Sequence, residues 1–166
     1  MLNGLVNGLI NIESPCMPRT VPVSSDEAAL EFIRLLWKVD HELHSVSKRM
    51  IGRFGLTAPQ RLALRFIGRE PGLTLGALAA LLHLDPGTVT GIVQRLESSG
   101  LVARARAEGD TRRMHLALTS KGQTLNRRRK GTVEAAVRHT LSAVTHADSA
   151  AAARVLRQLA ADLSNE

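Results

Sequence analysis

The residues of this chain that are best placed to do chemistry lie between positions 85 and 119, and their types suit contact with a polyanion. Asp85 precedes a proline, which is a strong signal for the start of a helix, and Gly100 is a signal for its end. A Gly-containing turn further on leads into paired arginines, Arg112 and Arg113. A short capped helix before a basic hairpin predicts a reader of double-stranded DNA, with the helix in a groove and the hairpin on the backbone beside it.

The helix after Asp85 divides into two faces. Its apolar side chains recur at spacings of three and four residues and should pack inward: Val89, Ile92, Val93 and Leu96. The opposite side carries small or polar residues, most of which can meet base edges or phosphates: Thr88, Thr90, Gly91, Gln94 and Arg95. Segments 101–107 and 114–118 read as two short strands around the turn, so we expect a hairpin there.

Positive charge is concentrated in one part of the chain. From Arg104 to Lys130 there are nine basic residues against two acids, a surplus equal to the formal net charge of +7 of the whole chain. A local basic excess is typical of a polyanion binder, because each neutralised phosphate releases condensed counterions. A solvated basic face that only keeps the protein soluble is the alternative.

Composition excludes several other classes. The chain has 166 residues, no Tyr and only four aromatic side chains, so helices are favoured over an all-β sandwich. Few aromatics also argue against a stacking platform for single-stranded nucleic acid. The single cysteine, Cys16, rules out an intrachain disulfide and a cysteine-cluster metal site. No apolar run is long enough to span a membrane, and the cytoplasm is the expected location.

Catalytic motifs are absent from the sequence. It contains no Gly-x-Ser-x-Gly elbow, no phosphate-binding Gly-rich loop and no His-Glu-x-x-His. We therefore expect neither an enzyme nor a bound cofactor.

The flanking segments are expected to be mostly helical. Prolines at 15, 18 and 22 predict a mobile or loosely docked tail over residues 1–24, within which Met17 is an alternative start. Residues 25–54 read as one long helix, and residues 120–144 and 146–163 as two more. Apolar residues recur along the first helix at spacings of four and three: Phe32, Leu36, Val39, Leu43, Val46 and Met50. So wide an apolar surface predicts packing between subunits, with core packing inside one chain as the alternative.

Between the flanking helices lies a winged helix-turn-helix pattern. Thr57 and Thr74 cap two shorter helices that precede the one after Asp85, and the hairpin follows. We therefore expect a mainly α fold of the α+β class, with the DNA-reading domain over residues 55–119.

An ordered set of short motifs runs through this region: Leu56-Thr57-Ala58-Pro59-Gln60, Leu73-Thr74-Leu75-Gly76-Ala77-Leu78-Ala79, Thr88-Val89-Thr90, Arg95-Leu96-Glu97-Ser98-Ser99-Gly100-Leu101-Val102-Ala103-Arg104, Asp110-Thr111-Arg112-Arg113 and Leu116-Ala117-Leu118-Thr119-Ser120-Lys121-Gly122. In this order and at these spacings, the set resembles the MarR family of transcriptional regulators, from about residue 26 to 163. The resemblance implies that helices 25–54 and 120–163 form a dimerisation domain. It also implies a homodimer on a pseudo-palindromic operator, usually a repressor released by a small ligand or an oxidant. Two recognition helices of such a dimer read half-sites roughly 34 Å apart.

The resemblance also assigns roles to residues. Thr88, Thr90, Gln94 and Arg95 would lie against the major groove, where Gln can pair with adenine and Arg with guanine. For the two threonines, phosphate contacts are as much expected as base contacts. Gly91 departs from the family, many members of which carry a basic residue there. Either the helix approaches the groove more closely at Gly91 or one contact is missing.

The hairpin tip matches the family's Asp-x-Arg motif. Arg112 would reach into the adjacent minor groove, with Arg113 beside it. Asp110 would pair with Arg104 and hold the wing in shape, partly buried, since an exposed pair contributes little.

Sensor sites are less well defined. Cys16 lacks an activated setting, so an incidental thiol is favoured over an oxidant sensor. His41 and His44 are three residues apart, but the usual zinc spacings are absent, so helix-surface or interface histidines are favoured. In this family the effector cleft lies between the dimer helices and the winged domain, which makes Trp37, His41, Arg61 and Arg65 candidate wall residues. Such a cleft would suit an aromatic or otherwise anionic effector.

The main alternative function is a sequence-independent, chromosome-associated nucleic-acid binder. It would use the basic run Arg127-Arg128-Arg129-Lys130. The alternative for this run is a basic helix face that contacts only water.

Overall fold

The computed structural model describes residues 25–107 and 110–165, and for residues 106–107 and 110–113 it describes the backbone alone. The chain divides into two compact units, residues 1–37 and 38–166. Cys16 lies outside the described residues, so the predictions made for it and for the tail stay predictions.

Helix α1 (Ser25–Phe54) confirms the long N-terminal helix. Asp26 and Glu27 lie in its first turn, where acidic side chains favour the helix dipole. Met50 is its one buried residue. Gly55, at φ 70°, ends the helix, and its N–H donates to the carbonyl of Ile51.

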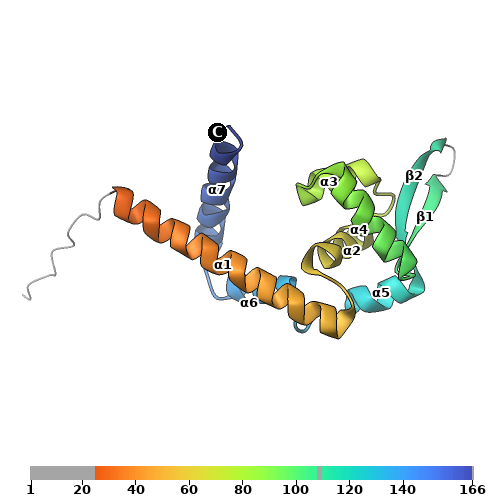
Figure 1. The fold of residues 1–166 in the computed structure, drawn as a ribbon, viewed down its shortest axis with the longest axis horizontal. Coiled ribbons are helices and arrows are strands. Elements are labelled where there is room, and N and C mark those ends of the chain that lie inside the picture. The colour runs from red at the N-terminus through yellow and green to blue at the C-terminus, as the bar shows by residue number, and fades with distance from the viewer. Residues whose placement is uncertain (1–24, 108–109, 166) are drawn as a thin grey trace, which may run out of the picture. The chain divides into compact units, whose positions relative to one another are not determined.

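Three helices and a hairpin form the winged helix-turn-helix (Figure 1). They are α2 (Ala58–Arg69), α3 (Leu75–Leu82), α4 (Pro86–Ser98), β1 (Val102–Ala107) and β2 (Asp110–Leu118). Thr57 caps α2 in a capping box with Gln60, and Thr74 caps α3. His83 ends α3 at φ 51°, and the chain then turns into α4.

The strands are antiparallel and pair from Val102 with Leu118 to Arg106 with Met114, after which the register shifts. A bridge between Leu73 and Leu116 ties the hairpin to the turn before α3.

One hydrophobic core lies beneath α4. It confirms the expected inward face of that helix, because Val89, Val93 and Leu96 are 0% exposed and Ile92 is 8% exposed. The rest of the core comes from α2, α3 and the base of the hairpin: Leu56, Ala63, Leu64, Ile67, Leu73, Leu78, Ala79, Leu101, Val102 and Leu116. Burial on this scale makes the winged domain a rigid support for the exposed face of α4.

The C-terminal part corrects the sequence prediction. One helix was expected over residues 120–144, but two form there, α5 (Ser120–Arg127) and α6 (Val133–Ser142), followed by α7 (His146–Leu163). α5 ends at Arg127, because Arg128 has extended backbone. Gly131, at a φ of 80° that no helix accommodates, and Thr132, which caps α6, complete the break. Thr119 and Thr145 cap α5 and α7 in the same way.

None of the described helices is by itself long and apolar enough to cross a membrane. Only α3 and α4 taken together, bent by 111°, reach that length and composition.

Candidate nucleic-acid interface

The exposed face of α4 carries the side chains expected to meet DNA. Thr88, Gln94 and Arg95 are exposed, and Thr90 is half-buried with its hydroxyl donating to the carbonyl of Pro86 at 2.8 Å. A methyl group built on Gly91 would meet nothing within 4 Å. The backbone of α4 is therefore open to close approach at Gly91, with polar side chains nearby on the same helix.

The backbone N–H groups at the start of α4 already have a hydrogen-bond acceptor. The Oδ1 atom of Asp85 accepts from the backbone N–H of Gly87 at 2.7 Å and of Thr88 at 3.3 Å. These two N–H groups would otherwise be free to bind an anion. An anion near the start of α4 would therefore meet side chains rather than free backbone N–H groups.

The hairpin is fixed to α4 by an ion pair that sequence reasoning missed. The Nε of Arg104 donates to Oε1 of Glu97 at 3.0 Å, and the two side chains are 36% and 28% exposed. The side chain of Asp110 lies outside the described residues, so its expected pairing with Arg104 stays a prediction. The side chains of Arg112 and Arg113 also lie outside them. In the sequence, Glu97 stood out only as an acid next to the last residue of α4.

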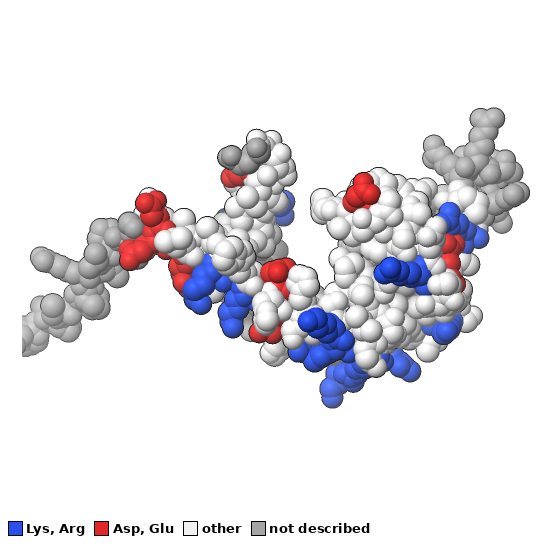
Figure 2. Space-filling model, viewed as in Figure 1, with Lys and Arg blue, Asp and Glu red and all other residues white. Residues whose placement is uncertain are grey.

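Further bonds hold the turn between α4 and β1. The hydroxyl of Thr119 donates to the carbonyl of Gly100 at 2.7 Å, and Nζ of Lys121 donates to the carbonyl of Ser99 at 2.8 Å. On the other side, the ring of His115 donates to the carbonyl of Gly72. On the face shown in Figure 2, blue side chains lie over the C-terminal end of α4 and beside the strands. These hydrogen bonds fix the base of the hairpin, which lies next to a cationic surface.

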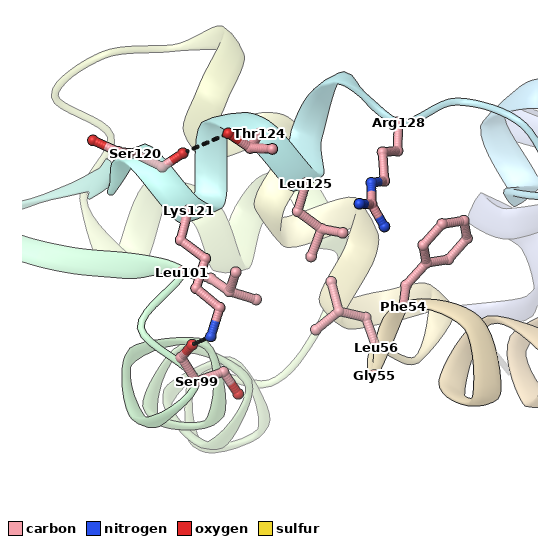
Figure 3. Close-up of a pocket in the computed structure, with 10 residues that line it drawn as sticks. All are labelled: Phe54, Gly55, Leu56, Ser99, Leu101, Ser120, Lys121, Thr124, Leu125 and Arg128. Atoms are coloured by element: carbon pink, nitrogen blue, oxygen red, sulfur yellow. Dashed lines mark hydrogen bonds between the residues drawn. The ribbon is translucent and has the colours of Figure 1, made fainter.

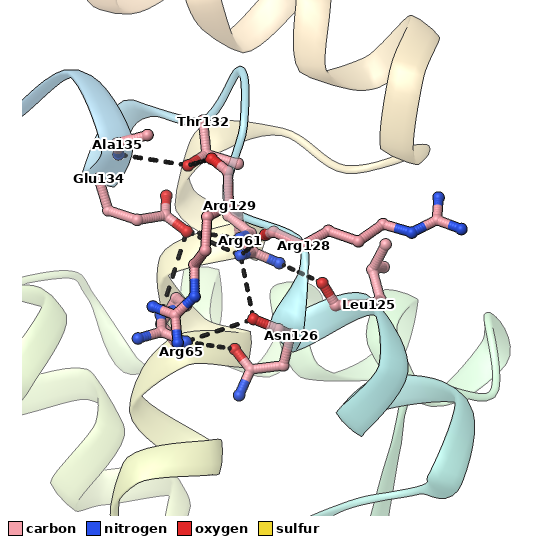
Figure 4. A network of polar contacts seen from close by, with 9 residues as sticks. All are labelled: Arg61, Arg65, Leu125, Asn126, Arg128, Arg129, Thr132, Glu134 and Ala135. Atoms are coloured by element: carbon pink, nitrogen blue, oxygen red, sulfur yellow. Dashed lines mark hydrogen bonds and ion pairs between the residues drawn. The ribbon is translucent and has the colours of Figure 1, made fainter.

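A buried arginine joins α2 to the break between α5 and α6 (Figure 4). Arg61 is 1% exposed. Its Nε donates to Oε1 of Glu134 at 2.8 Å, and its Nη atoms donate to the carbonyls of Leu125 at 2.8 Å, Asn126 at 3.3 Å and Arg128 at 2.5 Å. The guanidinium thus adds a donor to carbonyls at the C-terminal end of α5, of which that of Leu125 also accepts from the N–H of Arg128. The expected ligand role of Arg61 stays a prediction, but its donors are engaged within the chain.

Arg65 belongs to the same network. Its Nη1 donates to Oδ1 of Asn126 at 2.9 Å, and its Nε lies 4.0 Å from Glu134. Burial, with the nearby charge of Arg129, lowers the pKa of Arg65 from its ordinary value. The structure therefore brings together Arg61 and Arg65, two of the four expected effector-site residues. Trp37 and His41 are exposed on α1, and their role stays a prediction.

The histidines of α1 show no metal cluster. His44 pairs with Asp40, its Nδ1 lying 3.3 Å from Oδ1. Among the residues that the structure describes, no three His, Cys, Asp or Glu side chains lie close enough together to hold a metal ion.

Comparison with known proteins agrees with this geometry. Residues 54–113 match the sequence model of the MarR family. Over 138 residues the chain is 29% identical to the HTH-type transcriptional repressor Rv2887 of Mycobacterium tuberculosis, an alignment that covers 83% of this chain and 98% of that protein. Over this segment the chain is similar to MarR-family regulators.

Other relatives and solved structures extend the likeness. The organic hydroperoxide resistance transcriptional regulator of Bacillus subtilis is 34% identical over 91 residues, which cover 55% of this chain and 62% of the relative. The crystal structure of Streptococcus pneumoniae FabT in complex with DNA matches with a TM-score of 0.64 and 25% identity, covering 82% of this chain and 98% of that one. The mainly helical fold with a small antiparallel hairpin is that of MarR-family winged-helix regulators.

Proposed function

We propose that this protein is a sequence-specific transcriptional repressor that binds a pseudo-palindromic operator as a homodimer and is released from it by a small effector. The observation that carries the proposal is α4. One face of this helix is fixed in the core, and the other presents Thr88, Gln94 and Arg95 to solvent. A rigidly held helix with exposed Gln and Arg side chains is suited to reading base edges in a major groove. FabT, at 25% identity, has been solved on DNA with the same fold.

Separate roles follow for the two DNA-contacting elements. Gln94 and Arg95 would read bases or contact phosphates, with Thr88 and Thr90 contributing to either. Arg112 and Arg113 would bind the flanking minor groove. Because the Arg104–Glu97 pair fixes the hairpin to α4, the two elements would engage DNA as one body.

Dimerisation is proposed for helices 25–54 and 120–163. Large apolar side chains on α1 are exposed: Leu30, Phe32, Ile33, Leu35, Trp37, Val39, Leu43 and Ile51. α6 and α7 bury none of their described residues and expose Val137, Leu141, Val155, Leu156 and Leu163. An exposed apolar surface of this extent is typical of a subunit interface.

The effector is proposed to be a small aromatic or anionic molecule. Rv2887 has been solved with salicylic acid, in a structure that matches this chain with a TM-score of 0.52 and 29% identity. Action on an operator would place the protein in the cytoplasm. A regulator of this kind needs no catalytic step.

Selection of bound sequences from a random duplex pool tests the proposal directly. We expect enrichment of a two-fold symmetric motif whose half-sites are about ten base pairs apart. Enrichment of an asymmetric motif would contradict the dimeric geometry.

A sequence-independent binder remains the second candidate because of one observation. Arg127, Arg128, Arg129 and Lys130 are all exposed, and none forms an ion pair within the described part of the chain. A specific regulator should keep its selected site in a large excess of random duplex, whereas a sequence-independent binder should lose it.

A further inference from the structure

Four cationic side chains gather on the segment between α5 and α6 and on the last turn of α1. Together with Phe54 they line one cavity: Arg53, Arg128, Arg129 and Lys130. All four are exposed, and in the residues that the structure describes none of them forms an ion pair. This group of four residues, the link patch, is therefore available to an anionic partner.

The side chains of the link patch are held together by their surroundings. A methyl group built on Gly131 would overlap Nη1 of Arg53, so the guanidinium lies directly against that glycine. The same guanidinium lies over the Phe54 ring, 5.5 Å from its centroid. Figure 3 shows the Arg128 side chain directed toward Phe54 as well. Gly131 thus leaves room for a cation of α1 beside the cations that follow α5.

The backbone of the link patch is also fixed (Figure 4). The carbonyl of Arg128 accepts from the buried guanidinium of Arg61 at 2.5 Å. The carbonyl of Arg129 accepts from the hydroxyl of Thr132 at 2.8 Å. A cluster that is already ordered loses less conformational entropy on binding than a flexible basic run does.

The acid that lies closest to this segment in the chain, Glu134, does not balance its charge. Oε1 of Glu134 already accepts from Nε of Arg61 at 2.8 Å. Burial and then the charge of Arg129 lower the pKa of Arg65, so Arg129 acts on another cation. Such a cluster of like charges attracts an anionic partner, which relieves the repulsion within it.

The link patch and the exposed face of α4 belong to different sides of the winged domain. Helix α2 lies between them, because Ala63, Leu64 and Ile67 share the hydrophobic core with the inward face of α4. On another face of α2, Arg61 bonds the carbonyls at the end of α5. Figure 2 shows blue side chains below the end of α1 and α5, apart from those beside the strands. A duplex on α4 therefore leaves the link patch open.

We propose that the link patch binds the phosphate backbone of a second DNA duplex while α4 reads the operator, so that the protein connects two segments of DNA. Duplex DNA suits the patch because its phosphates are closely spaced, and several exposed cations are neutralised together with release of counterions. Single strands suit it less, since they need free aromatic faces and Arg53 already lies over Phe54. Binding of a duplex by the patch is independent of the proposed function, whereas binding of two duplexes at once rests on it.

A pair of double variants with equal loss of charge tests the proposal. Arg129→Gln/Lys130→Gln removes two cations of the link patch and keeps the backbone carbonyl to which Thr132 donates. Arg154→Gln/Arg157→Gln is the matched control. It removes two exposed cations from the face of α7 opposite its exposed apolar side chains, so the proposed subunit surface is left intact.

Each protein is first saturated with the selected operator and then titrated with a labelled duplex of random sequence, followed by fluorescence anisotropy at several salt concentrations. A second dye on the operator reports that it stays bound. We expect the intact protein and the control to bind the random duplex. In the link-patch variant this binding should weaken, and its log–log dependence on salt should fall by about two units, one for each cation removed. Operator affinity should be the same in the two variants.

The proposed surface is overturned if operator-saturated intact protein binds no second duplex, or if the two variants bind it equally. Displacement of the second duplex by polyglutamate as effectively as by unlabelled duplex would overturn DNA as the partner and favour an acidic protein. If no operator can be selected, the proposed function fails. Titration of random duplex alone then decides on the patch, because a salt dependence equal in the two variants would overturn it and a lower one in Arg129→Gln/Lys130→Gln would support it.

Discussion

Replacing Arg61 with Met should destabilise the protein more than any other single change of an arginine in the described residues. The guanidinium is almost completely buried and donates to one carboxylate and three backbone carbonyls. Met fills a similar volume but donates no hydrogen bond, so all four acceptors lose this partner. Breaking a buried ion pair by removing one member costs about 3–5 kcal/mol.

The lower end of that range is the better figure here, because the Glu134 side chain is 21% exposed and can regain water. The carbonyls of Leu125, Asn126 and Arg128 lie at the end of α5, where some solvent also reaches. We therefore expect a loss of about 3 kcal/mol in the free energy of unfolding. A loss of this size is a substantial fraction of the roughly 5–15 kcal/mol that stabilises a folded domain.

Urea unfolding followed by circular dichroism measures this loss, at one fixed protein concentration because dimerisation would add to the apparent stability. Arg65→Met is the matched control. Its side chain is 26% exposed, its Nε is as far as 4.0 Å from Glu134, and its one close hydrogen bond, to Oδ1 of Asn126 at 2.9 Å, is partly open to solvent, so its loss should cost about 1 kcal/mol. If Arg61→Met and Arg65→Met lose the same free energy of unfolding, the hydrogen bonds of Arg61 do not stabilise the segment between α5 and α6, and the reasoning is refuted.

Four other substitutions test the DNA-reading surface and its support. Gly91→Ala should raise the free energy of unfolding by about 0.5–1 kcal/mol, since the new methyl group meets nothing within 4 Å. The same change should weaken operator binding if α4 approaches the groove closely, and unchanged binding would exclude that approach. Gly122→Ala should cost about 1–3 kcal/mol in a urea titration, because its methyl group would overlap the carbonyl of Leu101, and a smaller cost would show that α5 can shift. Gln94→Ala should lower discrimination between operator and random DNA by about 1–3 kcal/mol, whereas equal losses on both would assign Gln94 to phosphates. Arg112→Ala should reduce the salt dependence of operator binding by about one unit of log–log slope, and an unchanged slope would remove Arg112 from the interface.

Local signals in the sequence predicted most of the winged domain. Asp85 with its following proline located the start of α4, and the spacing of Val89, Val93 and Leu96 located its inward face, because capping and periodicity depend on neighbours in the chain. The Arg104–Glu97 pair was not predicted. It joins a strand to a helix across seven residues, and no local pattern distinguishes Glu97 from a solvated acid.

The break after α5 was missed for a different reason. The run from Arg127 to Lys130 has good helix propensity, and a single Gly131 costs a helix only about 1 kcal/mol. Hydrogen bonds from another part of the fold stabilise the break, because Arg61 donates to carbonyls that a continuous helix would pair internally. The family resemblance placed Arg61 in the effector cleft, and the sequence alone gave no sign of its burial, because arginine is rarely buried unless it is paired.

Arg61 and the break in the helix are therefore best understood as one feature. If α5 continued into α6, the carbonyls of Leu125, Asn126 and Arg128 would have helical partners and Arg61 would be buried with fewer acceptors. Conversely, an apolar residue at position 61 would remove one donor from each of these carbonyls, and that of Arg128 would lose the donor that bonds it at 2.5 Å. Each half stabilises the other, and the direction of the chain as it leaves α5 depends on both. In a dimer held by α1, α6 and α7, that direction would help to set the separation of the two α4 helices, so the buried arginine would influence which half-site spacing the dimer accepts.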